Sequence, residues 1–311
     1  MPGNAKVWRD VSVVPPAKPG FLNLTRYGAV DALGAQVDLG PLMISSRAFK
    51  AVQTRAAPSP QATLLDGGHL WAGMIYGHFG HFITETLPRL LALRADLDAQ
   101  PTLRLLGFAP PGEITTTLAG MRWFLDRAGI DPARIDLVTE PALIAQLTVP
   151  PAPFTARYTY HPSVPQMIDR CGLSATKPSG ERIFLSRGQL AAPASRITNI
   201  AQVEALFVAA GYTILHPETL PVPDQIARIT AAAVLAGENG SALHWSLYSP
   251  HIQKVQSLGW SLALQQGICA VRGQTYQALR DPLFGRFRTR RQSVHPKHIS
   301  PYLAESALRN L

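Results

Sequence analysis

Two periodicities of apolar residues alternate along the chain from residue 62 onward. Short apolar runs predict strands, and apolar residues at helical spacing predict helices between them. In the first half the strands are expected at 62–65, 70–75, 103–108, 135–138 and 143–149. The helices are expected at 83–98 and 113–128, and Asp66-Gly67-Gly68 is expected to form a turn. Before residue 60, the pattern yields only isolated apolar runs at 11–14 and 39–44.

A second series with the same pattern follows a stretch rich in Pro and Gly, 150–178, which we interpret as a linker. Strands are expected at 182–186, 212–215, 233–236 and 252–257. Helices are expected at 199–210, 223–232 and 241–248, with a turn at 237–240. Asn199 stands at the N-cap of the first helix, and Gln202 occupies the capping-box position.

This alternation of strands and helices predicts an α/β fold with parallel sheets covered on both faces. Two series joined by a linker predict two Rossmann-like domains that face each other across a cleft. Ligands of such folds bind at the carboxyl ends of the strands. We expect an N-terminal domain over 1–155, a C-terminal domain over 156–275 and a tail over 276–311.

Composition narrows the class of protein. Hydrophobic residues make up 46% of the 311 residues and charged residues 16%, which excludes a disordered chain. Cys171 and Cys269 cannot form a disulfide framework, and no Cys/His cluster predicts a metal site. The sequence has neither a signal peptide nor an apolar stretch long enough to span a membrane, so we expect a cytoplasmic protein.

Positive charge is concentrated at the C-terminal end. The chain has a net charge of +9, and residues 280–311 carry seven Lys and Arg against two acidic residues. Such a tail can contact an anionic membrane surface or an acidic polymer, which would make the protein peripheral at the inner membrane face. A plain solvated terminus is the other interpretation. Few aromatic residues accompany the charge, so nucleic acid is not an expected partner.

The segment 233–248 reads as a strand, a glycine turn and a helix. This arrangement aims backbone N–H groups and the positive end of a helix dipole at whatever lies beyond the strand. Gly240 allows a ligand to approach the backbone closely, and Ser241 can cap the helix or bind an oxygen atom. A phosphate is the natural occupant. An ordinary strand–helix turn with a serine cap is the simpler alternative.

Two arginines follow the strand 182–186, Arg187 directly and Arg196 further on. Guanidinium groups are suited to bidentate binding of phosphate. If they share one edge with the Gly240 turn, they would clamp a diphosphate. Pairing with Glu181 or Glu204 at the surface is the alternative.

His81 and Glu85 lie one helical turn apart, opposite the apolar stripe of the helix 83–98. A His/Glu pair that faces away from the core is suited to general-base catalysis, because one group takes a proton while the other orients it. Pro88 should kink the helix or delay its start, because it lacks an N–H and crowds the carbonyl of Thr84. A locally paired, exposed His and Glu is the alternative.

Together these segments resemble glycosyltransferase family 61, whose bacterial members are often labelled capsular polysaccharide biosynthesis proteins. The stretch GHFGHFITETLPRLLAL at 77–93 is similar to the family's His-containing segment, and the resemblance extends over about 62–258. The later pieces, in order, are Ser186-Arg187, Arg196 with Asn199, Gly211-Tyr212, Pro217-Glu218, Gln225-Ile226 and Gly237 through Gly240-Ser241 to Leu243. The sequence departs from the family pattern at Glu238, Asn239 and Trp245.

The resemblance implies a GT-B fold and an inverting transfer of sugar from a nucleotide-sugar donor to a saccharide acceptor in surface polysaccharide synthesis. It implies no cofactor and no obligatory metal. Glu85 or His81 would act as the base, and the resemblance favours Glu85. The donor would be bound by Arg187, Arg196, Asn199, Glu218, Gln225, Gly240, Ser241, Ala242 and His244.

Two other functions remain open. One is a non-catalytic subunit that keeps the fold and binds polysaccharide or nucleotide-sugar, which the departures at Glu238, Asn239 and Trp245 favour. The other is a phosphate-binding hydrolase, although the sequence carries no nucleophile motif for it.

Overall fold

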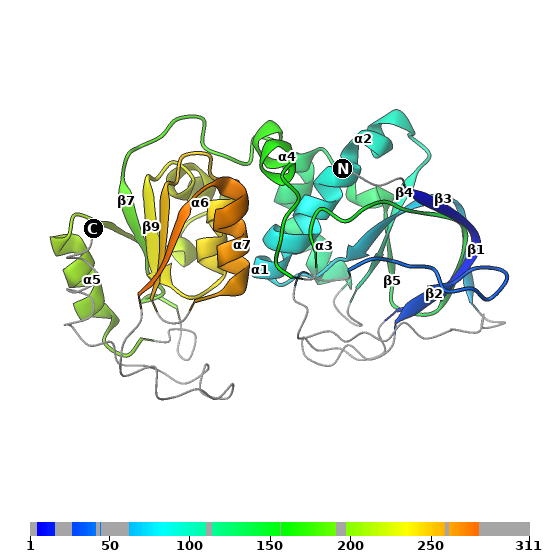
Figure 1. Cartoon of the computed structure of the whole chain (residues 1–311), viewed down its shortest axis with the longest axis horizontal. Coiled ribbons are helices and arrows are strands. Elements are labelled where there is room, and N and C mark those ends of the chain that lie inside the picture. The colour runs from blue at the N-terminus through cyan, green and yellow to red at the C-terminus, as the bar shows by residue number, and fades with distance from the viewer. Residues whose placement is uncertain are drawn as a thin grey trace. The chain divides into compact units, whose positions relative to one another are not determined.

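The computed structural model describes residues 5–15, 27–41, 44, 62–109, 114–155, 157–190, 197–258 and 261–279. The chain divides into two compact units, unit 1 over Met1–Cys171 and unit 2 over Gly172–Leu311. Each unit contains one sheet with helices packed on it, so the predicted α/β class is confirmed (Figure 1). The division falls after Cys171 rather than after residue 155, because the helix that follows the first sheet packs back onto a helix of unit 1.

The sheet of unit 1 has six strands in the order β2-β1-β6-β3-β4-β5. Its strands are β1 Lys6–Val14, β2 Gly28–Val30, β3 Thr63–Met74, β4 Arg104–Phe108, β5 Ile135–Val138 and β6 Ala142–Val149. The strands β3, β4, β5 and β6 are parallel to one another. The N-terminal strands β1 and β2 extend this sheet with antiparallel pairing.

The described helices of unit 1 gather on one side of its sheet (Figure 1). They are α1 Phe79–His81, the π-helical turn η1 Phe82–Thr86, α2 Leu87–Ala99, α3 Ile114–Ala128, the short η2 Pro132–Arg134 and α4 Val164–Arg170. On the other face, Tyr27, Val37 and Leu39 pack with Trp71 and Phe108 in one apolar core. The segment 27–41 therefore takes the place of the helical layer that the alternation predicts on this face.

The sheet of unit 2 has five parallel strands in the order β11-β10-β9-β7-β8. Its strands are β7 Arg182–Leu185, β8 Thr213–Leu215, β9 Val234–Glu238, β10 Lys254–Leu258 and β11 Thr275–Leu279. The helices are α5 Ile200–Ala209, the 3-10 turn η3 Pro217–Thr219, α6 Val222–Ile229, the 3-10 helix η4 Ser241–Tyr248 and α7 Ala263–Arg272. The helix α5 lies on one side of the strands and α6 and α7 on the other, as predicted (Figure 1).

Glycines account for two differences between the prediction and the structure. The expected turn at Asp66-Gly67-Gly68 is an irregularity inside the single strand β3, where Gly67 has φ +82° and the register with β6 shifts. Gly237 and Glu238 belong to β9 rather than to a turn. A Cβ on Gly237 would lie 2.7 Å from the backbone oxygen of Leu185, so only glycine lets these two strands pair here.

Helical elements account for the other differences. The stretch interpreted as a linker contains α4, which the Pro-rich composition hid. The segment 241–248 is helical as predicted but winds as a 3-10 helix. Asn199 is the N-cap of α5, but its side chain donates to the Gln202 side chain (3.1 Å) instead of capping the backbone. The tail expected to begin at residue 276 instead contributes residues 276–279 to β11, and residues 280–311 lie outside the described part.

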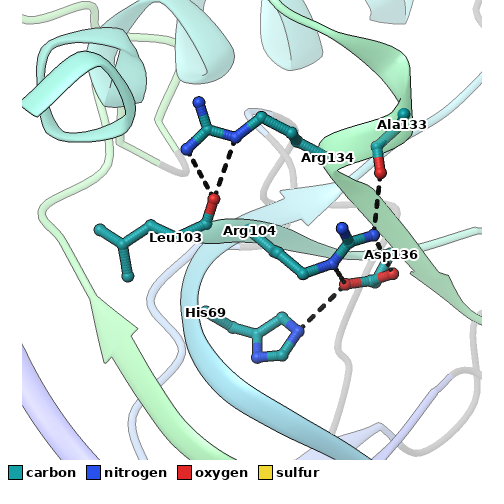
Figure 2. Close-up of polar contacts among 6 residues, drawn as sticks. All are labelled: His69, Leu103, Arg104, Ala133, Arg134 and Asp136. Atoms are coloured by element: carbon teal, nitrogen blue, oxygen red, sulfur yellow. Dashed lines mark hydrogen bonds and ion pairs between the residues drawn. The ribbon is translucent and has the colours of Figure 1, made fainter. Parts of the chain in front are cut away.

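The middle of β3 and the amino-terminal ends of β4 and β5 are joined by a polar cluster around Asp136 (Figure 2). Arg104 donates to both carboxylate oxygens of Asp136, at 2.5 and 2.7 Å, and to the carbonyl of Ala133 at 2.9 Å. The buried His69 approaches the same carboxylate through Nε2 at 3.0 Å. Burial alone would raise the pKa of Asp136, but hydrogen bonds from Arg104 and His69 outweigh it and hold that pKa below its usual value.

Asp136→Asn is expected to lower the free energy of unfolding by about 1–3 kcal/mol. The Arg104 groups and the His69 Nε2–H all donate, so an amide would place its NH₂ against another donor. Because the folded-state pKa of Asp136 is depressed, the contribution is present at neutral pH and is lost as pH falls below about 4. Urea titrations at pH 7 and at lower pH measure this loss.

Asp126→Asn is the matched control, because its pair with Arg122 is exposed. We expect that change to alter the unfolding free energy by less than about 0.5 kcal/mol. An equal effect of the two substitutions would contradict a special role for the Asp136 cluster.

Candidate active site

In unit 2 the strand order reverses between β7 and β9. These strands are neighbours in the sheet, but the chain leaves one toward β8 and the other toward β10. Parallel sheets bind ligands at such a reversal, outside the carboxyl ends of the strands. Ser186 and Arg187 follow β7, and Asn239 and Gly240 follow β9.

Arg187 and Gly240, singled out separately in the sequence, meet at this reversal. A Cβ atom built on Gly240 would lie 2.9 Å from Nη1 of Arg187. The guanidinium thus lies against the backbone of the glycine turn at the start of η4. Gly240 has an extended backbone with φ 173°, so it is the space beside Arg187 and not the conformation that favours glycine here.

A hydrogen-bonded loop holds Arg187 in this position. The buried Ser186 accepts a hydrogen bond from the backbone N–H of Gly188 (3.0 Å) and donates one to Glu204 on α5 (2.5 Å). His216, at the end of β8, lies 3.8 Å from the same Glu204 carboxylate. Glu204 therefore fixes the loop that carries Arg187 through Ser186.

The other predicted donor-binding residues have different surroundings. Glu218 lies 4.0 Å from His216 beyond β8. Asn199 begins α5, Ser241 and Ala242 begin η4, and Arg196 lies outside the described residues. Gln225 donates to the Leu220 carbonyl (2.9 Å) and accepts from the indole of the buried Trp245 (3.3 Å).

His244 is held by a glutamine that the sequence did not single out. Gln265 donates from its amide nitrogen to Ser246 Oγ (2.7 Å), so its oxygen faces His244 Nδ1 at 2.9 Å. The histidine therefore donates through Nδ1–H, and its Nε2 carries the lone pair when the ring is neutral.

In unit 1 the predicted catalytic pair lies just beyond the carboxyl end of β3. The helical segment is broken into α1, the π-helical turn η1 and α2, in line with the kink or late start expected from Pro88. Pro88 explains the break, because it cannot donate to the carbonyl of Thr84. Tyr160 OH donates to that carbonyl instead, at 2.9 Å.

Both carboxylate oxygens of Glu85 have partners. Oε1 forms a short hydrogen bond with Nδ1 of His81, and Oε2 accepts from the backbone N–H of Ile44 at 2.7 Å. The Glu85 side chain is 5% exposed, whereas the His81 side chain is 14% exposed. A carboxylate at Nδ1 favours the tautomer whose Nε2 is the acceptor. In this arrangement His81 holds the more accessible basic atom.

A buried arginine supports the same segment. Arg89 donates to the Pro41 carbonyl (2.6 Å), and its guanidinium lies 4.9 Å from the ring centre of Phe154. Burial lowers the pKa of Arg89 to about 10, while the Glu85 carboxylate favours its charged form. Gly73 leaves room for this side chain, since a Cβ there would lie 2.6 Å from the Arg89 Nε.

Ile44, Arg89 and Gln265 are the positioning residues that sequence reasoning missed. The Ile44 contact spans 41 positions and uses a backbone group, so no side-chain pattern signals it. Arg89 does stand in the helical segment that the sequence singled out, and its position on the buried side of a helix was the available signal.

Within the described residues, no group of three or more His, Cys, Asp or Glu side chains could hold a metal ion. No helix in that part of the chain is both long and apolar enough to cross a membrane.

The two sheets and their polar edges define an α/β protein in which Arg187 meets the Gly240 turn at a strand reversal of unit 2, and a His–carboxylate pair follows β3 in unit 1. The chain belongs to glycosyltransferase family 61: the model of that family, Glycosyltransferase 61, matches residues 79–255, more than half of the sequence. The match begins at α1 and ends in β10, so it includes the His81–Glu85 pair and the contact of Arg187 with the Gly240 turn. A comparison with curated proteins gives no significant match.

Proposed function

We propose that this member of the family is an inverting glycosyltransferase that moves a sugar from a nucleotide-sugar to a saccharide acceptor in capsular or other surface polysaccharide synthesis. Unit 2 binds the donor and unit 1 the acceptor, as the two halves of a GT-B enzyme. The observation that carries this proposal is the contact of Arg187 with the Gly240 turn at the strand reversal.

The leaving diphosphate needs positive charge where its own negative charge develops. Arg187 supplies a guanidinium, and the backbone N–H groups of Gly240, Ser241 and Ala242 supply further donors at the start of η4. Preorganised donors of this kind stabilise a developing anion without a metal ion. We therefore propose a metal-independent reaction, with Asn199, Glu218 and His244 around the rest of the donor. Arg196 is proposed for the same site from the sequence alone.

His81 is the better placed base in unit 1. Its Nε2 takes the proton of the acceptor hydroxyl as the oxygen bonds to the anomeric carbon. The bond from that carbon to the diphosphate oxygen breaks, and its electron pair leaves with the diphosphate. Glu85 holds the ring through Nδ1–H and stabilises the imidazolium that forms. This assignment reverses the preference for Glu85 that the family resemblance gives.

The alternative of a non-catalytic binding subunit rests on Glu238 and Asn239. Both side chains are buried beside the turn at Gly240, and a carboxylate there opposes a nearby phosphate. Trp245 does not add to this alternative, because its side chain is fully buried and bonded to Gln225. The basic segment 280–311, outside the described residues, is proposed to dock on an anionic membrane or polymer.

Calorimetric titration of UDP, GDP and CMP tests the proposal. We expect one of them to bind, and the corresponding nucleotide-sugars to donate to saccharide acceptors. Binding without transfer to any acceptor in a broad panel would favour the binding subunit. Absence of binding by all three nucleotides would exclude the proposed donor site.

A further inference from the structure

Three rings cluster at the carboxyl end of β3, before and within the first turn of α1. Tyr76 and His78 stack with their planes 13° apart and their centres 6.1 Å apart. His81 contacts both edge-on, with its ring centre 5.5 Å from that of Tyr76 and 5.4 Å from that of His78. The site as described above uses only His81.

These two rings are accessible to a ligand in different degrees. Tyr76 is half-buried, and its inner side packs against the apolar core that contains Trp71 and Phe108. His78 is exposed. Tyr76 is anchored in the core next to an exposed ring of nearly the same orientation, so binding of a ligand to the pair orders little of the Tyr76 side chain.

The exposed imidazole is neutral at pH 7. Burial of part of the ring, and then the neighbouring His81, lower the pKa of His78 below its usual value. A neutral aromatic ring accepts an apolar partner on its face and hydrogen bonds at its edge. The pair of rings therefore offers a mixed apolar and polar surface, without charge, directly beside the proposed base.

We propose that Tyr76 and His78 form a stacking platform for the acceptor sugar, with the C–H face of a pyranose ring against the outer face of His78 and with Tyr76 supporting His78 from the core side. Sugars combine an apolar C–H face with hydroxyl edges, which matches this surface, whereas an anionic ligand would find no cation in the pair. The platform would place an acceptor hydroxyl next to His81. This inference rests on the proposed transferase function and names the group that unit 1 binds.

Saturation-transfer NMR with a panel of methyl glycosides tests the platform without requiring turnover. We expect at least one glycoside to bind the full-length protein. The Kd of that glycoside should rise about tenfold in His78→Ala and in Tyr76→Ala, because the stacked face is lost. Tyr76→Phe, which keeps the ring, should bind within about twofold of the wild type.

Two further measurements separate the possible failures. Because Tyr76 packs on the core, thermal unfolding checks the Tyr76→Ala protein, and the exposed His78→Ala carries the conclusion if Tyr76→Ala unfolds. Equal glycoside binding in His78→Ala and wild type, or no glycoside binding at all, would overturn the platform. Nucleotide titration of the wild type runs in parallel. If the wild type binds a glycoside but no nucleotide, and His78→Ala loses the glycoside, the result would support the platform and contradict the transferase function.

Discussion

Glu85→Gln is expected to slow sugar transfer by about 10²–10⁴-fold and to leave nucleotide binding near the wild-type value. The reason lies in the fixed orientation of the side chain. The Ile44 N–H requires an acceptor, so the amide oxygen of the glutamine would take the place of Oε2. Its NH₂ group would then face Nδ1 of His81, and the ring would carry its proton on Nε2, the atom that must accept one. Initial rates with saturating donor measure the effect.

His81→Ala is the companion variant and should lose a similar factor. Asp98→Asn, which breaks an exposed pair with Arg94 in the same helical stretch, is the control and should transfer normally. A protein that keeps most of its activity in His81→Ala but loses it in Glu85→Gln would make Glu85 the base, as the family resemblance suggests. Full turnover of Glu85→Gln would place the base elsewhere.

Arg187→Ala should weaken binding of the nucleoside diphosphate by about 1.5–3 kcal/mol, which is roughly tenfold to a hundredfold in Kd. The guanidinium faces the turn at Gly240, where the proposed diphosphate lies, and charge-assisted hydrogen bonds to phosphate are among the strong ones. The difference in Kd between Arg187→Ala and wild type should be smaller for a nucleoside than for the nucleoside diphosphate. A nucleoside has no diphosphate group, so Arg187 has nothing to bind in either protein. Calorimetry with the two ligands measures this difference.

Gly240→Ala tests the contact between Arg187 and the Gly240 turn by changing the turn instead of the arginine. The added methyl group would meet the flexible end of Arg187 and displace it without strain in the backbone, so binding should weaken while thermal stability is kept. Arg228→Ala, at an exposed position near the end of α6, is the control for loss of one positive charge. If Arg187→Ala and Arg228→Ala lost equal nucleotide affinity, Arg187 would contribute only through the net charge of the protein and not through a specific contact.

The sequence predicted the parts of the fold that depend on local pattern. The strand at Ile135–Val138 appears with the predicted bounds, β4 ends at Phe108 as expected, and β7 ends at Leu185, one residue before the expected end. The sequence made the meeting of Arg187 with the Gly240 turn a condition for a diphosphate clamp, and the two do meet, because the carboxyl ends of parallel strands share one edge. Local periodicity and the shared edge of parallel strands suffice for such features.

Features that depend on distant partners were not predictable. The π-helical turn at Phe82–Thr86 exists beside Pro88 because Tyr160 compensates the carbonyl of Thr84 from 76 positions away. Gly237 reads as a turn residue, and only its closeness to Leu185 shows why a strand needs it. The partner of Glu85 at Ile44 is a backbone group and leaves no trace in the side-chain pattern.

The matched range 79–255 is smaller than the folding units that contain it. A fragment cut to those limits would lack β1, β2 and β3, and with them all the described pairing of β6, as well as the backbone donor to Glu85. At the other end it would lose α7, and with it Gln265 and the orientation of His244. The region that the family model matches therefore contains both proposed clusters but lacks strands of both sheets, so expression or engineering should keep the flanking segments.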